Sequence, residues 1–204
     1  SPGTGKTAAA HAIAHRLGLE IIELTYADLV SKFFGEGAQN VKQVFDFAAA
    51  RRAVLFVDEA DSLLSKRLVN SDQPAGQAIN SMRSELLTAI EKHSGIVIFA
   101  TNLIENYDPA FDTRVKHVRF ELPDREMVQH LWAAHLVRTL PLAQAVDPVV
   151  LADRFPDLCG RDIKSMVIDA AVRTAIAGRA SVGLAELDAA YRAVVEARRR
   201  DGQT

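Results

Sequence analysis

The fold is decided by the first seven residues, Ser1-Pro2-Gly3-Thr4-Gly5-Lys6-Thr7. They complete the phosphate-loop pattern G-x-x-x-x-G-K-[ST] except for its first glycine, which would stand immediately before Ser1. Because a phosphate loop follows a buried strand, we expect the natural protein to extend upstream and to supply that strand. The alternative is an ordinary glycine-rich turn before a helix, but Thr-Gly-Lys-Thr ahead of a strong helix favours the phosphate loop.

Each part of this loop has a chemical reason. The glycines on either side of Thr4 let backbone amides approach phosphate oxygens, so residues 3–5 are expected to bind phosphate. Lys6 would neutralise the terminal phosphates, and the Thr7 hydroxyl would be offered to magnesium. The positive end of the helix predicted over residues 7–17 adds to the attraction for anions.

Two acidic residues follow a continuously apolar stretch further along the chain. Residues 53–57 read Ala-Val-Leu-Phe-Val, which is typical of a strand buried on both faces, and Asp58 and Glu59 come directly after it. Alone, this pattern is often just a solvated strand end. Together with the phosphate loop it predicts that Asp58 holds magnesium through water and that Glu59 polarises the attacking water.

Strands and helices alternate over the first 123 residues. We expect strands at 19–24, 53–57, 96–101 and 117–121. We expect helices at 7–17, at 39–50 and around the apolar stripe from 78 to 90, with a turn around Asp28 and a loop over 65–76. This alternation predicts a parallel α/β sheet, whose ligands bind outside the carboxyl ends of the strands.

Beyond Pro123 the pattern changes to helices alone. Apolar stripes occupy residues 128–136, 163–171 and 184–194, and Asp147-Pro148 supplies an N-cap and a first-turn proline for a short helix between the first two. We therefore expect an α/β domain over residues 1–123 and a small four-helix domain over residues 124–204.

The composition excludes several classes of protein. The 204 residues carry 24 basic and 26 acidic side chains, a net charge of -2, so no basic field favours nucleic acid or an anionic membrane. The apolar runs are far shorter than the roughly 18 residues of a membrane span. Cys159 is the one cysteine, which excludes an internal disulfide and indicates the cytoplasm or another reducing compartment.

Three further stretches, taken with the phosphate loop, resemble the AAA ATPases, the AAA branch of the AAA+ superfamily. They are Leu55-Phe56-Val57-Asp58-Glu59-Ala60-Asp61-Ser62-Leu63, Ala100-Thr101-Asn102 and Asp108-Pro109-Ala110. The resemblance spans almost the whole chain. It implies a parallel sheet in the order 5-1-4-3-2, followed by a four-helix lid, with the central strand being the one expected before Ser1. It also implies an ATP hydrolase that uses Mg²⁺ and works as a homo-oligomeric ring, expected to be a hexamer, on protein or peptide substrates.

The resemblance assigns two sensor residues. Asn102 is similar to the sensor that orients the attacking water opposite Glu59, although an Asn at this place could also cap a turn. Arg161 stands in Gly160-Arg161-Asp162, where the family often shows Gly-Ala-Asp, and resembles the second sensor arginine of other AAA+ groups. An arginine there can reach the terminal phosphate or lie on the surface of a first helical turn, and both interpretations stay open.

The arginine finger departs most from the family pattern. The family usually carries two arginines after Asp-Pro-Ala, whereas this chain has Thr113 where the first is expected, followed by Arg114. Arg114 is therefore the candidate, ahead of Lys116 and Arg119. A finger acts on the nucleotide of a neighbouring subunit, so this assignment also implies an oligomer.

A candidate pore loop follows the strand predicted at 19–24. Lys32-Phe33-Phe34-Gly35-Glu36 resembles the first pore loop of the family, in which Phe33, Phe34 and Gly35 would grip peptide in the ring channel. A buried Phe pair beside a turn is the alternative. The flanking charges and Gly37 favour the pore loop, and residues 65–76 are a candidate second one.

Other candidate sites and functions are less well supported. His11 and His15 lack the Glu of H-E-x-x-H, so we expect a surface helix face and no protease domain in this chain. Cys159 suits packing, and residues 198–200, three arginines, suit a solvated helix end. The alternative function is an AAA+ switch or loader acting on a nucleoprotein complex, whose expected basic excess is absent. A scaffold that binds ATP without turnover is left open by Thr113 alone.

Overall fold

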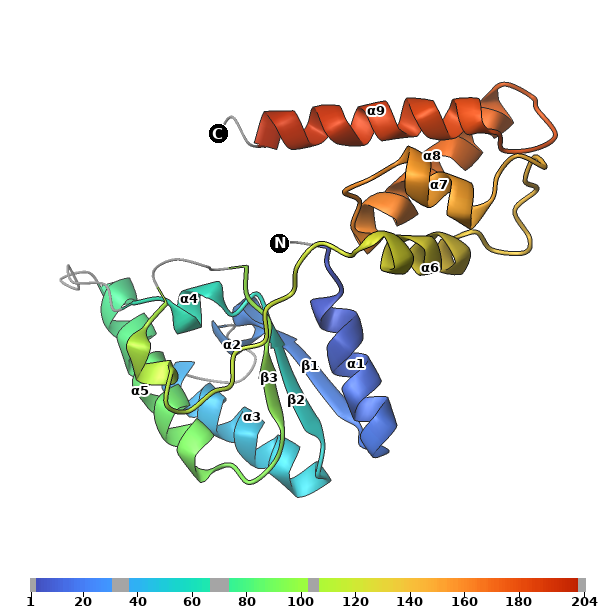
Figure 1. The fold of residues 1–204 in the computed structure, drawn as a ribbon. Helices are drawn as coiled ribbons and strands as arrows, with labels where there is room; N and C mark the ends of the chain where they lie inside the picture. Colours follow the sequence, from blue (N-terminus) through green and yellow to red (C-terminus); the bar gives the residue numbers. More distant parts are fainter. Residues whose placement is uncertain (1–2, 31–36, 67–73, 103–106, 202–204) are drawn as a thin grey trace. The chain divides into compact units, whose positions relative to one another are not determined.

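The computed structural model describes residues 3–30, 37–66, 74–102 and 107–201. The chain divides into two compact units (Figure 1). The first, here called the α/β unit, spans Lys6–Arg119. The second, here called the helical unit, consists of Phe120–Thr204 together with Ser1–Gly5.

The described part of the α/β unit contains a parallel sheet in the order β1-β2-β3. The strands are β1 Ile21–Thr25, β2 Val54–Asp58 and β3 Val97–Phe99. Strand β2 pairs on both sides, with Val57 opposite Leu24 of β1 and Phe99 of β3. Its first four residues are buried, as predicted for an apolar run with a covered face on each side.

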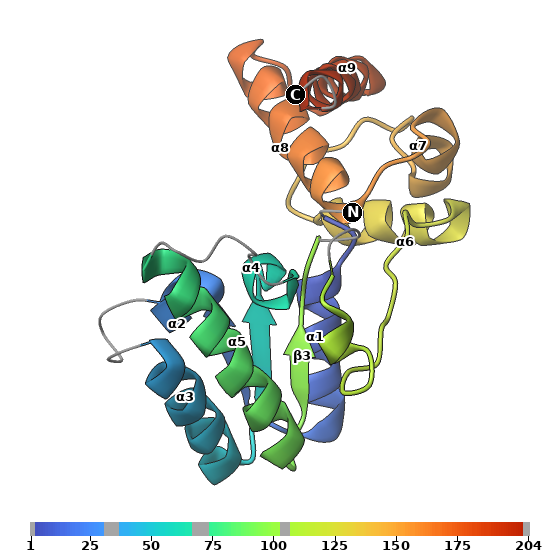
Figure 2. The ribbon, with the colours of Figure 1, turned by 90° about the vertical axis from the view of Figure 1, so that its left-hand side faces the viewer.

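Helices cover both faces of this sheet. They are α1 Lys6–Leu17, α2 Tyr26–Val30, α3 Gly37–Arg51, α4 Asp61–Leu64 and α5 Pro74–Lys92, with a 3₁₀ helix, η2, at Pro109–Phe111. Figures 1 and 2 show α3 and α5 on one face and α1 on the other. Alternate side chains of β2 follow the same division, because Leu55 and Val57 join the core made with α3 and α5, whereas Phe56 packs with Ala10 of α1.

The helical unit has its own core. Its helices are α6 Arg125–His135, α7 Pro148–Arg154, α8 Gly160–Ile176 and α9 Leu184–Asp201. Trp132, Phe155 and Met166 are among the fully buried side chains at its centre. Asp147 caps α7 as predicted, with Oδ1 accepting the N–H of Val149 at 2.9 Å.

Two local predictions are wrong. Residues 117–121 form no strand, because a strand needs a neighbour to pair with, and none of the described strands pairs with this segment. The predicted turn around Asp28 is helix α2. Thr25 and Asp28 start this helix with reciprocal bonds, since Asp28 Oδ2 accepts the Thr25 N–H at 2.7 Å and Thr25 Oγ1 accepts the Asp28 N–H at 3.3 Å.

Boundaries shift elsewhere. The strand predicted over 96–101 shortens to the three residues of β3, and α5 begins at Pro74, inside the predicted loop. A parallel α/β sheet and a four-helix unit are nevertheless the predicted architecture. The division after residue 123 remains a prediction about domains.

Candidate nucleotide site

Four of the predicted site residues meet at the carboxyl end of the sheet. Lys6 begins α1, and its Nζ donates to Asn102 Oδ1 at 2.8 Å. Thr7 lies in the same first turn, and its Oγ1 donates to Asp58 Oδ2 at 3.1 Å. The helix start, the end of β2 and the segment after β3 are thus linked through side chains.

Asp58 and Glu59 occupy a sharp turn after β2. The backbone N–H of Glu59 donates to Asp58 Oδ1 at 2.8 Å, so both Asp58 oxygens accept hydrogen bonds. Glu59 is exposed and has a φ of +53°, a left-handed conformation that costs a residue other than glycine about 1–3 kcal/mol. A strained backbone persists only where the surrounding structure holds it in place, and such residues cluster at functional sites.

The glycines of the phosphate loop have backbone conformations that favour glycine. Gly3 has a φ of +78° and Gly5 a φ of +97°. Within the helical unit, a Cβ on Gly3 would lie 2.7 Å from both Arg161 Cβ and Cys159 Sγ. Only glycine fits at position 3, and Arg161 in the first turn of α8 lies directly against it.

The oxygen, amide and ammonium groups of this site suit the binding of a nucleotide with Mg²⁺. Hydroxyl and carboxylate oxygens, such as those of Thr7 and Asp58, are the ligands that Mg²⁺ prefers. Successive backbone amides of residues 3–5 and the start of the 12-residue helix α1 suit phosphate. Lys6 adds the one positive side chain of the loop.

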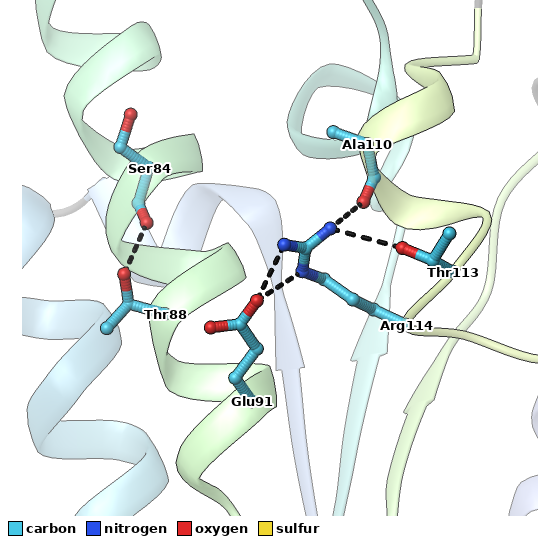
Figure 3. Close-up of polar contacts among 6 residues, drawn as sticks. All are labelled: Ser84, Thr88, Glu91, Ala110, Thr113 and Arg114. Atoms are coloured by element: carbon cyan, nitrogen blue, oxygen red, sulfur yellow. Dashed lines mark hydrogen bonds and ion pairs between the residues drawn. The ribbon is translucent and has the colours of Figure 1, made fainter.

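The candidate finger, Arg114, is held within its own chain (Figure 3). Its Nε and one terminal nitrogen donate to Glu91 Oε1 of α5, at 2.7 and 2.6 Å. The other terminal nitrogen donates to the Ala110 carbonyl at 2.7 Å and to Thr113 Oγ1 at 3.3 Å. Arg114 therefore joins the C-terminal part of α5 to the 3₁₀ helix.

A sequence model of the ATPase family associated with various cellular activities (AAA) matches residues 1–122. The chain belongs to the AAA family of ATPases. ATP hydrolysis and the use of ATP with Mg²⁺ are features of this family, so the predicted class of enzyme and its cofactors are confirmed at that level.

Curated relatives cover nearly the whole chain. It is 34% identical over 209 residues to an ATP-dependent zinc metalloprotease YME1 homolog of Caenorhabditis elegans, covering 98% of this chain and 28% of the relative. It is 32% identical over 206 residues to the ATP-dependent zinc metalloprotease FtsH of Ralstonia pickettii (96% and 28%). It is 32% identical over 200 residues to proteasome-activating nucleotidase 2 of Haloferax volcanii (93% and 48%). The chain thus spans less than half the length of each of these relatives.

Sequence reasoning missed two residues of this AAA domain. Asp61, the first residue of α4, accepts the backbone N–H of Asn102 at 2.9 Å on Oδ1, which also accepts the Thr101 hydroxyl. Its place as the third acid in Asp58-Glu59-Ala60-Asp61 was the available signal. Glu91, the partner of Arg114, carries no such signal because it is one of several charges on a long helix.

The candidate pore loops fall largely outside the described residues, and the described residues contain neither a membrane helix nor a metal cluster. Phe33, Phe34 and Gly35, the candidate pore loop, lie in the segment 31–36 that the structure does not describe, as does most of the candidate second loop. Among the described residues, no helix is both long and apolar enough to cross a membrane. Nor do three His, Cys, Asp or Glu side chains gather as a metal site in that part of the chain.

Proposed function

We propose that this chain is the Mg²⁺-dependent ATPase domain of a ring-forming AAA motor that remodels proteins. The observation that carries the proposal is the meeting of Lys6 with Asn102 and of Thr7 with Asp58 at one end of the sheet. It brings a phosphate-neutralising cation, two magnesium-ligand types and a polar side chain to the edge where parallel sheets bind ligands.

Each residue has one part in the reaction. Residues 3–5 and Lys6 bind the phosphates, and Thr7 with Asp58 holds Mg²⁺, which neutralises charge on the phosphates when it is bound. Glu59 takes the proton of the attacking water, and Asn102 holds that water in line. Arg161 lies against Gly3 of the loop, which supports its role as a second sensor of the terminal phosphate.

The motor part of the proposal is supported by the relatives. Proteins named as ATP-dependent zinc metalloproteases and as a proteasome-activating nucleotidase match nearly the whole of this chain, which supports work on protein substrates. The ring is what membership of the AAA family leads us to propose. In such a ring Arg114 would act on a neighbour's nucleotide. Phe33, Phe34 and Gly35 would form the pore loop that grips the substrate. A reducing compartment such as the cytoplasm fits the single, buried cysteine.

The experiment compares Glu59→Gln with wild type in the full-length protein. The variant should bind ATP with unchanged affinity, because Lys6, Thr7 and Asp58 are intact, and lose turnover by about 100-fold or more, the usual contribution of a positioned base. Glu23→Gln, an exposed acid on β1, is the matched control and should retain turnover. Normal hydrolysis by Glu59→Gln would move the base elsewhere.

Phe33→Ala tests the motor in the same assays. If Phe33 grips substrate, folding and basal ATP turnover should stay near wild type while ATP-driven unfolding of a protein substrate is lost. If Phe33 is a core residue, the truncation should lower stability by about 3–5 kcal/mol and lose turnover as well. A thermal melt of the variant separates the two outcomes.

A further inference from the structure

The ends of β2 and β3 are joined by more than their ladder. The last bond between them runs from the Ala100 N–H to the Val57 carbonyl at 2.9 Å. Beyond it, the N–H of Ala60 donates to the Ala100 carbonyl at 3.0 Å. Asp61 then accepts from the next two residues, the hydroxyl of Thr101 and the N–H of Asn102.

The Asp61 side chain therefore holds the segment that carries Asn102, the candidate sensor. Asp61 Oδ1 accepts the backbone N–H of Asn102 at 2.9 Å. The side-chain oxygen of Asn102 in turn accepts a hydrogen bond from Lys6 Nζ at 2.8 Å. One carboxylate oxygen thus fixes the main chain from which the Asn102 amide projects. Because a carboxylate is a strong acceptor, two hydrogen bonds to it hold that main chain more firmly than neutral partners would.

We propose that Asp61 is a positioning residue for ATP hydrolysis, which acts by fixing the backbone of Asn102 and so the place of its side chain at the attacking water. The proposal rests on the proposed function, because Asn102 matters only if ATP is hydrolysed there. The described bonds of Asp61 go to Thr101 and Asn102, the segment that carries the sensor, so we expect its effect to fall on turnover more than on ATP binding. A misplacement of about 1 Å in such a site can cost about 100-fold in rate.

The test measures kcat and the Kd for ATP of the full-length protein. Asp61→Ala should lower kcat by about 10- to 100-fold and leave the Kd within about twofold. Asp61→Asn keeps an oxygen acceptor in the same place but without the charge, and should restore part of the rate. Unchanged kcat in Asp61→Ala, or no recovery in Asp61→Asn, would overturn the proposal.

A double-mutant cycle shows whether Asp61 acts through Asn102. In an Asn102→Ala background, Asp61→Ala should cost less than about threefold further, because residues that act as a unit are not additive. The full separate cost of Asp61→Ala in that background would contradict the proposal. It would show that Asp61 acts on the site by another route.

Asp28 provides the matched control. Its carboxylate accepts a backbone N–H and a hydroxyl, both from Thr25, at 2.7 Å each, at the end of the neighbouring strand β1. Asp28→Ala should leave basal kcat unchanged even where it lowers the melting temperature. An equal loss of kcat in Asp28→Ala would mean that any loosened strand end slows turnover, and the proposal would fail.

Two further variants keep the result interpretable. If Asp61→Ala does not fold, Thr101→Val removes one of the two donors and should lower kcat several-fold at constant Kd, whereas unchanged kcat would overturn the proposal. Glu59→Gln measured beside them tests the proposed function itself. If Glu59→Gln abolishes turnover and the Asp61 series does not change it, only the role of Asp61 is wrong.

Discussion

At the scale of single residues, Arg114 has two possible roles. Its guanidinium is about one-third exposed and is bonded to Glu91 and to the Ala110 carbonyl. Such contacts can hold a finger in a defined direction for a neighbouring subunit. They are equally suited to a structural tie between α5 and the 3₁₀ helix. The two roles differ in what happens when subunits are mixed.

We expect Arg114→Ala to bind ATP normally and to lose hydrolysis, because a finger acts on the neighbour's nucleotide. Mixing it with Glu59→Gln subunits should restore part of the activity, since some interfaces then pair an intact Arg114 with an intact Glu59. Glu91→Ala should keep more activity than Arg114→Ala. Absence of recovery in rings shown to exchange subunits, with equal losses in Glu91→Ala, would identify Arg114 as a structural tie.

Residues were predictable from the sequence where topology alone brings them together. Lys6, Asp58 and Asn102 each follow or begin an element at the carboxyl edge of a parallel sheet, so their meeting could be anticipated from the alternation of strands and helices. The acidic run that ends in Asp61 was a signal for that residue, but neither its partners nor the pairing of Glu91 with Arg114 could be anticipated, because these bonds depend on how α4 and α5 turn against the sheet. No local pattern encodes that orientation.

At the scale of elements, the short helix α7 depends on its cap. Asp147 Oδ1 accepts the N–H groups of Val149 and Val150, at 2.9 and 3.4 Å, and the helix has only seven residues. Asp147→Ala should lower the free energy of unfolding by about 0.5–2 kcal/mol. Asp147→Ser retains an acceptor oxygen and should stay close to wild type. Chemical denaturation measures both, and an Asp147→Ala variant as stable as wild type would show that the cap contributes nothing.

The two wrong predictions of secondary structure have identifiable physical causes. The strand expected over residues 117–121 was predicted from its own sequence, but a strand exists only through its ladder, and no described strand pairs with it. Helix α2 was not predicted because its five residues are too few to show the periodic apolar stripe of a helix. Its signal was instead the reciprocal cap between Thr25 and Asp28, a four-residue pattern.

At the scale of the whole molecule, the two largest hydrophobic clusters lie in different units of the chain. One contains buried residues of β2, α3 and α5, and the other contains those of α6 to α9. The change from alternating strands and helices to helices alone is why we expect two domains, because each pattern needs its own partner to bury its apolar face; the boundary after residue 123 stays a prediction. The gripping of substrate, ring size and compartment remain predictions about the complete protein.

ATP binding to the full-length protein, measured by calorimetry with wild type, Lys6→Ala and Lys42→Ala, tests the nucleotide site most directly. Lys42 is an exposed lysine of α3 and serves as the control. Lys6→Ala should weaken binding by about 100-fold or more, or abolish it, because the loop has no other cation for the terminal phosphates; this corresponds to about 3 kcal/mol. Lys42→Ala should bind as wild type does. Unchanged ATP affinity in Lys6→Ala would contradict the assignment of residues 3–7, and with it the ATPase site proposed for this chain.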